Sequence, residues 1–272
     1  MSVNVRPKEN NTAAWILFAV IVAVIAVFII GIVCYFIFKD SASYDRATGC
    51  PVVNGRVSPS SQVIVVIDET DHLTDIQADY LRVSLRKLAQ NEMEPGSLLT
   101  IYSLKDRIGA DRKPVFEACK VRDGSDANAL TENERLIRRR FIKFFKRPLE
   151  NIIRSAEEAD GTSSSPIFEV IQSASVNSVK KWDPPEGTRL VIYSDMLHNT
   201  SGFSMYQRHP NFEAFKKTPY AVQTRSDLSG VEVDLRYFMS SPKFQGQDNL
   251  KFWKAYFRNA GAVVESVVPI GK

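Results

Sequence analysis

Oxygen-bearing side chains gather in three short loops that the sequence pattern places at the ends of strands. The loops are Asp68-Glu69-Thr70-Asp71-His72, Ser165-Pro166 and Ser194-Asp195. Carboxylate and hydroxyl oxygens are hard ligands, and with almost no sulfur or imidazole among them they suit Mg²⁺, Mn²⁺ or Ca²⁺. Asp68 and Thr70, two residues apart in an extended turn, can both reach one ion directly or through water. We therefore expect Asp68, Thr70, Ser165 and Asp195 to share a divalent cation.

The elements that must position these loops alternate between strand and helix. Val63 to Ile67 is a run of β-branched residues, typical of a strand buried on both faces of a parallel sheet. Further strands are predicted at 97–104, 114–120, 189–194, 231–239 and 262–268, and helices at 74–90, 132–159, 166–180, 211–217 and 248–259. This alternation predicts an α/β fold with a doubly wound, mostly parallel sheet, whose ligands bind beyond the carboxyl ends of the strands.

A membrane anchor is predicted ahead of this domain. Residues 13–38 contain no charged side chain, and roughly 25 apolar residues span a hydrocarbon core of about 30 Å. The run exceeds the 7–15 residues typical of a signal-peptide core. The remaining boundaries are a disordered tail at 1–12, a Ser/Gly/Pro-rich linker at 39–61, the domain at 62–268 and a tail at 269–272. Arg6 and Lys8 slightly favour a cytoplasmic amino terminus, which places the domain outside the cytoplasm.

Composition narrows the function classes. The chain has 272 residues and a net charge of +4, with cations and anions intermixed, which does not indicate nucleic-acid binding. The densest basic stretch, Arg138 to Arg147, is interpreted as a solvated helix face; contact with anionic lipid or nucleic acid is the alternative. No G-x-S-x-G elbow or phosphate-binding Gly-rich loop with Lys is present, and Thr70 stands where an aspartyl phosphatase needs a second Asp.

The three loops, in their order and strand context, resemble the von Willebrand factor A (vWA) family. Its metal-ion-dependent adhesion site begins with D-x-S-x-S after the first strand, and the segment from Asp68 to His72 is similar to it. Ser165 to Ile171 resembles the second element, with Ser165 where the family has Thr. Leu190 to Asp195 resembles the third. The resemblance covers residues 60–268 and implies a metal-dependent site for a protein partner, with Asp195 acting through water.

His72 departs from the family pattern, which usually has Ser there. An imidazole could weaken Mg²⁺ binding, favour a transition metal or point into solvent, and a metal-free site is an alternative. Glu69 and His198 are further candidates for the metal or for the rim around it. A three-histidine site formed by His72, His198 and His209 is also considered.

The resemblance implies a membrane-anchored module that binds a protein partner through a cation, which completes its coordination with a partner carboxylate. We expect no enzymatic activity, small-molecule substrate or nucleic acid. One alternative is a structural subunit of a membrane complex with a vestigial metal site. Another is a metal-dependent hydrolase with His72 or Glu69 as general base. The loop from Met196 to Pro210 is expected at the partner-facing rim, through Phe203, Met205 and Tyr206, or else to be packed down by these side chains.

Cys50 and Cys119 are the two cysteines outside the apolar span, which holds Cys34. In a vWA-like sheet both belong to the flank of the domain, and we expect a disulfide between them. Such a bridge requires an oxidising compartment, whereas two separate thiols would fit a reducing cytoplasm.

Overall fold

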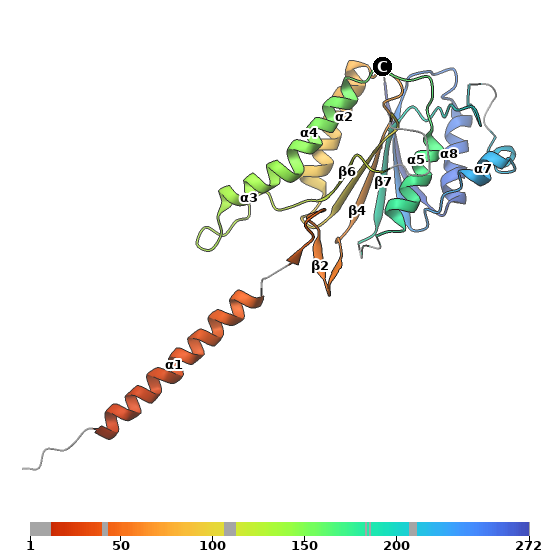
Figure 1. Cartoon of the computed structure of the whole chain (residues 1–272). Helices are drawn as coiled ribbons and strands as arrows, with labels where there is room; N and C mark the ends of the chain where they lie inside the picture. The colour runs from red at the N-terminus through yellow and green to blue at the C-terminus, as the bar shows by residue number, and fades with distance from the viewer. Residues whose placement is uncertain are drawn as a thin grey trace, which may run out of the picture. The chain divides into compact units, whose positions relative to one another are not determined.

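The structure, a computed structural model, describes residues 12–39, 43–105, 113–182, 184, 186–206 and 211–271. The chain divides into two units, Met1–Ser43 and Tyr44–Lys272. The first unit contains one helix, α1 (Thr12–Lys39), which is labelled in Figure 1. Its segment Trp15–Tyr35 has a mean hydropathy of 3.5 and is long and apolar enough to cross a membrane. The predicted disordered tail at 1–12 lies outside the described residues except for Thr12.

The second unit is a mixed α/β domain built on a six-stranded sheet. Its strands are β4 (Gln62–Ile67), β5 (Leu98–Ser103), β6 (Phe116–Cys119), β7 (Thr188–Ser194), β8 (Val231–Phe238) and β9 (Val263–Ile270). They lie in the order β6-β5-β4-β7-β8-β9, and every neighbouring pair is parallel except β5 and β6. The prediction of a mostly parallel sheet is confirmed. The first strand of this sheet lies beside its fourth, so the winding direction reverses between β4 and β7.

Helices cover both faces of the sheet, because the side chains of β4 alternate between two cores. Val63, Val65 and Ile67 pack with one set of helices, α2 (Asp75–Lys87) and α4 (Arg147–Glu157). Ile64 and Val66 pack toward the opposite set. That set comprises α5 (Ile167–Ala174), α6 (Phe212–Phe215), α7 (Pro219–Gln223) and α8 (Gln247–Asn259). Figure 1 shows the two layers on either side of the sheet.

Several elements differ from the sequence prediction. The predicted linker contains three short strands, β1 (Ser43–Tyr44), β2 (Pro51–Val53) and β3 (Arg56–Val57), which form their own small sheet. The helix predicted at 132–159 is α3 (Glu134–Phe141), a π-helical segment η2 (Ile142–Lys146) and α4. Pro148 does not break it: the backbone stays helical on both sides of η2, and the π-helical turn directly precedes Pro148. The predicted tail at 269–272 begins inside β9, which extends to Ile270.

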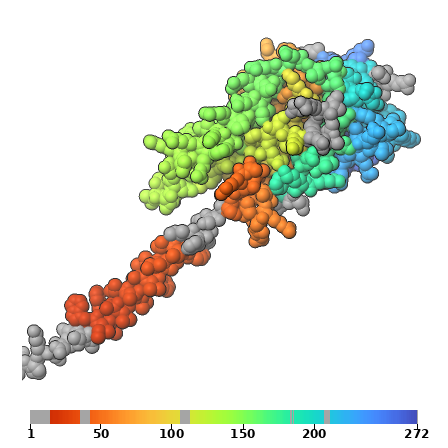
Figure 2. All heavy atoms as spheres, in the orientation of Figure 1, coloured from red at the N-terminus to blue at the C-terminus, as the bar shows by residue number. Residues whose placement is uncertain are grey.

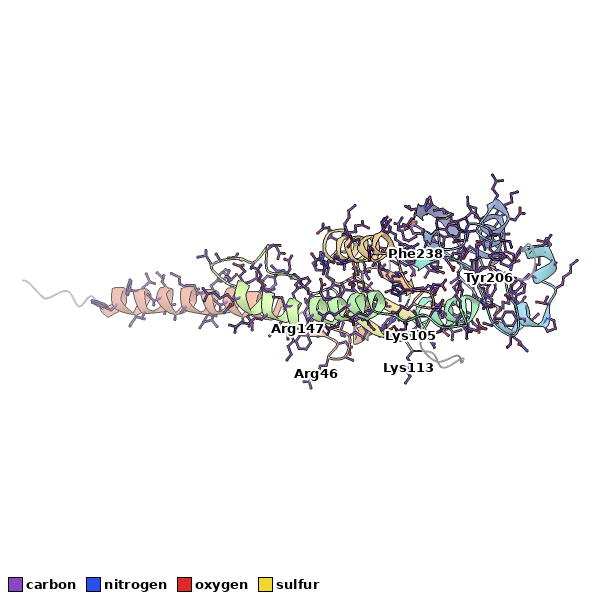
Figure 3. The ribbon with its side chains drawn as sticks, turned by 90° about the horizontal axis from the view of Figure 1, so that it is seen from above. Arg46, Lys105, Lys113, Arg147, Tyr206 and Phe238 are labelled. Atoms are coloured by element: carbon purple, nitrogen blue, oxygen red, sulfur yellow. A yellow bond between two sulfur atoms is a disulfide. The ribbon has the colours of Figure 1, made fainter. Side chains whose placement is uncertain are left out.

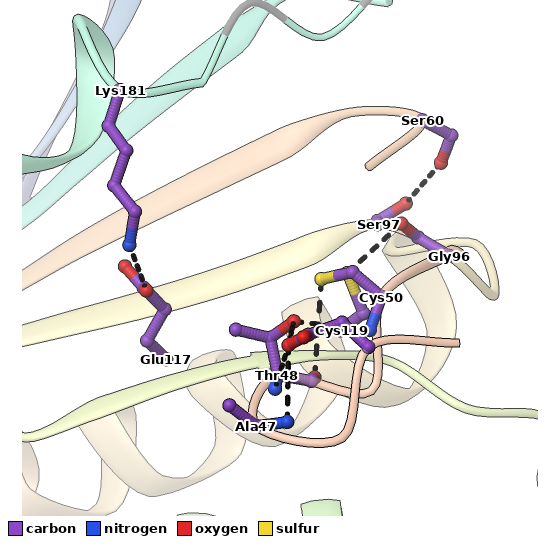
Figure 4. Close-up of a disulfide and its surroundings, with 10 residues drawn as sticks. Ala47, Thr48, Cys50, Ser60, Gly96, Ser97, Glu117, Cys119 and Lys181 are labelled. Atoms are coloured by element: carbon purple, nitrogen blue, oxygen red, sulfur yellow. Dashed lines mark hydrogen bonds and ion pairs between the residues drawn. A yellow bond between two sulfur atoms is a disulfide. The ribbon is translucent and has the colours of Figure 1, made fainter. Parts of the chain in front are cut away.

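The expected disulfide is present (Figure 4): Cys50 and Cys119 are bonded, with a Cα–Cα distance of 4.8 Å. The chain ahead of Cys50 is held against β6 as well, because the Cys119 N–H donates to the Thr48 carbonyl at 2.8 Å. Asp45 caps this turn by accepting from the Thr48 N–H at 2.7 Å and the Thr48 hydroxyl at 2.8 Å. These hydrogen bonds lower the pKa of Asp45. The amino-terminal end of the domain is therefore fixed to the sheet edge.

Replacing both Cys50 and Cys119 with Ser should lower the free energy of unfolding by about 4 kcal/mol. The bridge closes a loop with a sequence separation of 69, and an unfolded chain without that closure gains entropy. Urea unfolding of the detergent-solubilised full chain, followed by tryptophan fluorescence, measures the difference. A loss below about 1 kcal/mol would show that the bridge adds little to the hydrogen bonds around it.

Candidate functional site

The site lies where β4 and β7 end side by side. Ile67 pairs with Tyr193 in parallel register, and the Asp68 N–H continues the ladder by donating to the Tyr193 carbonyl at 2.8 Å. Asp68 and Ser194-Asp195 therefore leave the sheet together at its switch point. All three side chains are buried: Asp68 is 5 %, Ser194 1 % and Asp195 4 % exposed.

Hydroxyl groups surround the Asp68 carboxylate. Its Oδ1 accepts from the Thr70 hydroxyl at 2.5 Å and the Thr70 N–H at 3.1 Å. Its Oδ2 accepts from the Ser194 hydroxyl at 2.6 Å and, more weakly, from the Ser165 hydroxyl at 3.4 Å. All three loops predicted from the sequence thus meet at one carboxylate. This agrees with the expectation for Asp68, Thr70 and Ser165, although contacts among ligand residues do not test whether a metal binds.

The Ser165 loop is held in place by backbone pairing to the loop after β7. Ser165 and Asn199 exchange two backbone hydrogen bonds, at 2.8 and 2.9 Å. On the other side, the Thr162 N–H donates to the Thr70 carbonyl at 2.6 Å. Gly161 permits this approach: it has φ +76°, and a Cβ there would lie 2.9 Å from the Thr70 carbonyl oxygen.

A tight turn follows Asp195. Its Oδ1 accepts from the Leu197 N–H at 2.8 Å, and the Ser194 hydroxyl oxygen accepts from the Met196 N–H at 2.8 Å. Met196 has φ 57°, a conformation that is strained for a residue with a side chain. The Trp253 indole N–H holds the turn by donating to the Met196 carbonyl at 2.8 Å. Asp195 Oδ2 is buried and has no hydrogen-bond donor among the described residues.

Carboxylates repel one another at this site. Burial raises the pKa of Asp195 well above its ordinary value, and the charge of Asp68 raises it further. The Asp71 carboxylate, which approaches Asp195, acts in the same direction. Burial also raises the pKa of Asp68, opposed by the hydrogen bonds from Ser194 and Thr70. Three acidic groups thus share one small region, and of the two that are buried Asp195 accepts fewer hydrogen bonds than Asp68.

Tyr206 lies within the field of these carboxylates. Burial raises the pKa of its phenol, and the charges of Asp195, Asp71 and Asp68 add to the effect. The side chain is 37 % exposed and its ring contacts the edge of Phe244 at 5.0 Å between centroids. A protonated phenol at the solvent side of the site is an available hydrogen-bond donor.

His72 and Glu69 each have a hydrogen-bond partner outside the group around Asp68. His72 is exposed, and its Nδ1 lies 3.3 Å from the Ala159 carbonyl oxygen. Glu69 is buried and accepts from the Ser103 hydroxyl at the end of β5, at 2.9 Å.

His198 belongs to a separate buried network. Its Nδ1 accepts from the Ile167 N–H at 3.1 Å, so Nε2 carries the proton and faces the Tyr220 hydroxyl at 2.9 Å. Tyr220 in turn donates to Glu169 Oε1 at 2.5 Å. Burial lowers the pKa of His198 to about 3, so the ring stays neutral. With both nitrogens engaged, His198 has none left for a metal, and its zero exposure removes it from the rim.

The loop after Asp195 is mostly packed down. Met205 is 2 % exposed and lies in the core, while Phe203 stacks on Phe252 with 6.2 Å between ring centroids. Only Tyr206 among the three expected rim residues is exposed. His209 and Pro210 lie outside the described residues.

The donor set fits a hard divalent cation. Within the described parts of the chain, no group of three or more His, Cys, Asp or Glu side chains is arranged to hold a metal ion. The candidate site therefore depends on hydroxyl oxygens together with the carboxylates of Asp68 and Asp195. Oxygen-only donors of this kind match Mg²⁺, Mn²⁺ or Ca²⁺ rather than a metal that needs imidazole or thiolate.

Comparison with known proteins assigns no relationship: no family model matches the chain, and no curated protein matches it.

Sequence reasoning assigned no role to Asp71 or to the Ser194 hydroxyl. Both residues belong to the loops that it singled out, so the signal was present in their chemistry. Whether a loop side chain points into the site depends on the local backbone conformation, which the sequence pattern does not reveal.

Asp195→Asn should stabilise the metal-free protein at pH 7, by about 1 kcal/mol or more, because the amide needs no proton to be neutral in the interior and can donate to its acidic neighbours. The folded-state pKa of Asp195 is raised, so the folded protein keeps a proton that the unfolded chain has released. The protein with the native Asp195 therefore loses stability as pH rises from the pKa of this group in the unfolded chain to its raised pKa in the folded protein.

Urea unfolding in chelator between pH 4 and 7 tests this expectation. The advantage of the Asn variant should be smallest at pH 4 and grow with pH. An advantage that stays constant over this range would show that Asp195 does not carry the repulsion.

His198→Gln should remove part of the acid sensitivity of folding. Since the folded pKa of His198 is about 3 and that of an unfolded His is about 6.5, the unfolded chain takes up a proton first. Stability is lost as pH falls through this interval, with a slope approaching about 1.4 kcal/mol per pH unit. The same titration on the Gln variant should lack this component; identical slopes in both proteins would contradict the assignment.

Proposed function

We propose that the protein is a membrane-anchored, vWA-like interaction module that binds a protein partner through a divalent cation. The observation that carries the proposal is the buried Oδ2 of Asp195, which has no donor among the described residues and lies in the acidic group formed with Asp68 and Asp71. Such a carboxyl group must either keep a proton or carry a poorly compensated charge, and a cation would stabilise its ionised form.

In this proposal Asp68, Thr70 and Ser165 hold the ion, and Asp195 completes its environment directly or through water. The ion supplies an electrophilic position that a carboxylate of the partner can occupy. The hydroxyls that now donate to Asp68 would turn their lone pairs to the metal, since a hydroxyl can donate or accept. Tyr206, exposed beside the acidic group, can donate to the incoming partner.

The anchor and the bridge support a location outside the cytoplasm. α1 supplies one helix of spanning length, and the Cys50–Cys119 disulfide is typical of an oxidising compartment. With a cytoplasmic amino terminus, the domain would face the periplasm or the cell exterior. The partner would then be a protein of that compartment or of the same membrane.

A structural subunit with a vestigial site is the second candidate, and one observation favours it. The Asp68 carboxylate already accepts hydrogen bonds from the hydroxyls of Thr70, Ser194 and Ser165. A hydrogen-bond network of this kind can hold the three loops together without any metal. The two proposals differ in their response to divalent cations.

A saturating divalent cation should raise the melting temperature of the full chain in detergent by about 5–10 °C, the shift expected when the cation is present at a hundred times its Kd. Mn²⁺ is a suitable probe, because its binding can also be counted by paramagnetic resonance. Asp68→Asn should abolish both the shift and the bound Mn²⁺. The matched control is Asp248→Asn, which removes an exposed carboxylate on α8 and should leave both unchanged.

Partner capture separates the two candidates. Affinity purification of the solubilised full chain should recover a protein in Mg²⁺ that is lost in chelator and in the Asp68→Asn variant. Recovery of the same protein under all three conditions would establish the structural subunit instead.

A further inference from the structure

A basic arm extends from the helical layer that contains α2 and α4. It consists of residues 135–147, the end of α3 with η2 and the start of α4, and it contains seven cations and no acidic residue. The cations are Arg135, Arg138, Arg139, Arg140, Lys143, Lys146 and Arg147, and all seven are exposed. Figure 2 shows the yellow-green atoms of α3 standing out from the domain.

The cations of the arm are almost unpaired, unlike other arginines of the domain. Arg86 binds Glu150 at 2.5 Å, and Arg122 binds Glu132 at 2.5 Å. Within the described residues, the arm's one ion pair is Arg138 with Glu134 at 3.9 Å, and both side chains are more than 60 % exposed. Such a contact contributes little. The arm therefore keeps nearly its whole positive charge.

Apolar side chains are exposed among these cations. Phe144 is 59 %, Leu136 48 % and Ile142 37 % exposed. The neighbouring Phe141 and Phe145 are buried, and Phe145 contacts Phe116 of β6 with 5.8 Å between ring centroids. Core packing thus explains Phe141 and Phe145 but leaves three large apolar groups in water. Lys and Arg together with exposed Phe, Leu and Ile are the side-chain types with which proteins bind anionic lipid surfaces.

The arm lies at the end of the domain opposite the candidate site. The carboxyl end of α4 leads to Gly161 and Thr162, which contact the Thr70 carbonyl, so α3 begins at the far end of the same helical layer. Figure 3 labels Arg46 and Arg147 close together, with Tyr206 well to their right in the same domain. The disulfide fixes the entry of the chain to β6, the strand that the arm packs against.

The covalent tether limits how far the domain can lie from a membrane that contains α1. Five residues separate Lys39, the end of α1, from Asp45, which caps the turn held on β6. Such a segment reaches at most about 20 Å. A bilayer that contains α1 is therefore within reach of the arm.

We propose that the basic arm binds the anionic lipid headgroups of the membrane in which α1 lies, so that the candidate site is directed away from that membrane. The cations contact headgroup phosphates, and Phe144, Leu136 and Ile142 enter the interface. An acidic protein is the less suitable occupant, because the apolar groups are scattered among the charges and the tether holds the arm close to lipid. The proposal depends on α1 spanning a membrane and is independent of the cation site.

The test uses the full chain with Cys34→Ser, reconstituted in nanodiscs of phosphatidylcholine alone or mixed with phosphatidylglycerol. An environment-sensitive aromatic dye is attached through Phe144→Cys, and quenching by spin-labelled lipid reports contact. Strong quenching is expected in the anionic discs and weak quenching in the neutral ones. The reference dye position is Val222→Cys on α7, 70 % exposed, which should be quenched in neither.

Charge variants distinguish lipid binding by the arm from a general attraction between the positive charge of the domain and the anionic membrane. Replacing Arg138, Arg139, Arg140 and Lys143 with Gln should weaken docking about fivefold for each cation removed. The control replaces four exposed lysines of the opposite layer with Gln and should retain docking; these are Lys216, Lys217, Lys251 and Lys254. Circular dichroism verifies that both proteins are folded.

Three results would overturn the proposal. They are a dye at position 144 that is quenched no more than the dye at 222, quenching that is equal in neutral and anionic discs, and an equal loss of quenching in the two charge variants. A protein that binds the arm while the dye stays unquenched would identify the arm as a protein-binding surface instead.

Discussion

Repulsion between buried carboxylates is the constraint around which the domain's switch point is arranged. Asp68 is level with Ser194 and Asp195 follows one residue later, so parallel pairing of β4 and β7 brings the two carboxyl groups together in the interior. The loops around them compensate Asp68 with three hydroxyls, whereas Asp195 Oδ2 has no donor among the described residues. Ser165 is held by Asn199, and the turn after Asp195 is held by Trp253. These supports keep the acidic groups together against their repulsion, which is the arrangement that a cation-binding site requires.

The domain also separates its charges along its length. Acidic oxygens lie at the carboxyl ends of β4 and β7, whereas the basic arm occupies the opposite end, where the disulfide joins the chain's entry to β6. If the arm binds lipid, a short tether and a rigid edge would present the acidic end to other proteins rather than to the membrane. The bridge then has two effects: it stabilises the fold, and it limits the orientations available to a domain attached through few residues.

Much of this architecture is predictable because the spacing of hydrophobic residues and the residue types of the loops can be recognised in short stretches of sequence. The run Val63–Ile67 predicts a central strand, and β4 is buried at every position. Loops with Asp, Thr and Ser at strand ends indicated Asp68, Thr70, Ser165 and Asp195, and the structure brings the first three into direct contact. What the sequence leaves open concerns packing. His198 is a polar residue that the sequence places in a loop, yet its hydrogen bonds to Ile167 and Tyr220 allow it to be fully buried. Met205 likewise fills the core. No local pattern distinguishes such residues from exposed ones, because their partners are distant in the chain.

The most direct test of the cation site is a crystal structure of the full chain grown with Mn²⁺, with the anomalous signal of the metal recorded. We expect an anomalous peak among the oxygens of Asp68, Thr70 and Ser165, close to Asp195, and its loss in the Asp68→Asn variant. Well-ordered loops without a peak at saturating Mn²⁺, or a peak that persists in the variant, would contradict the account.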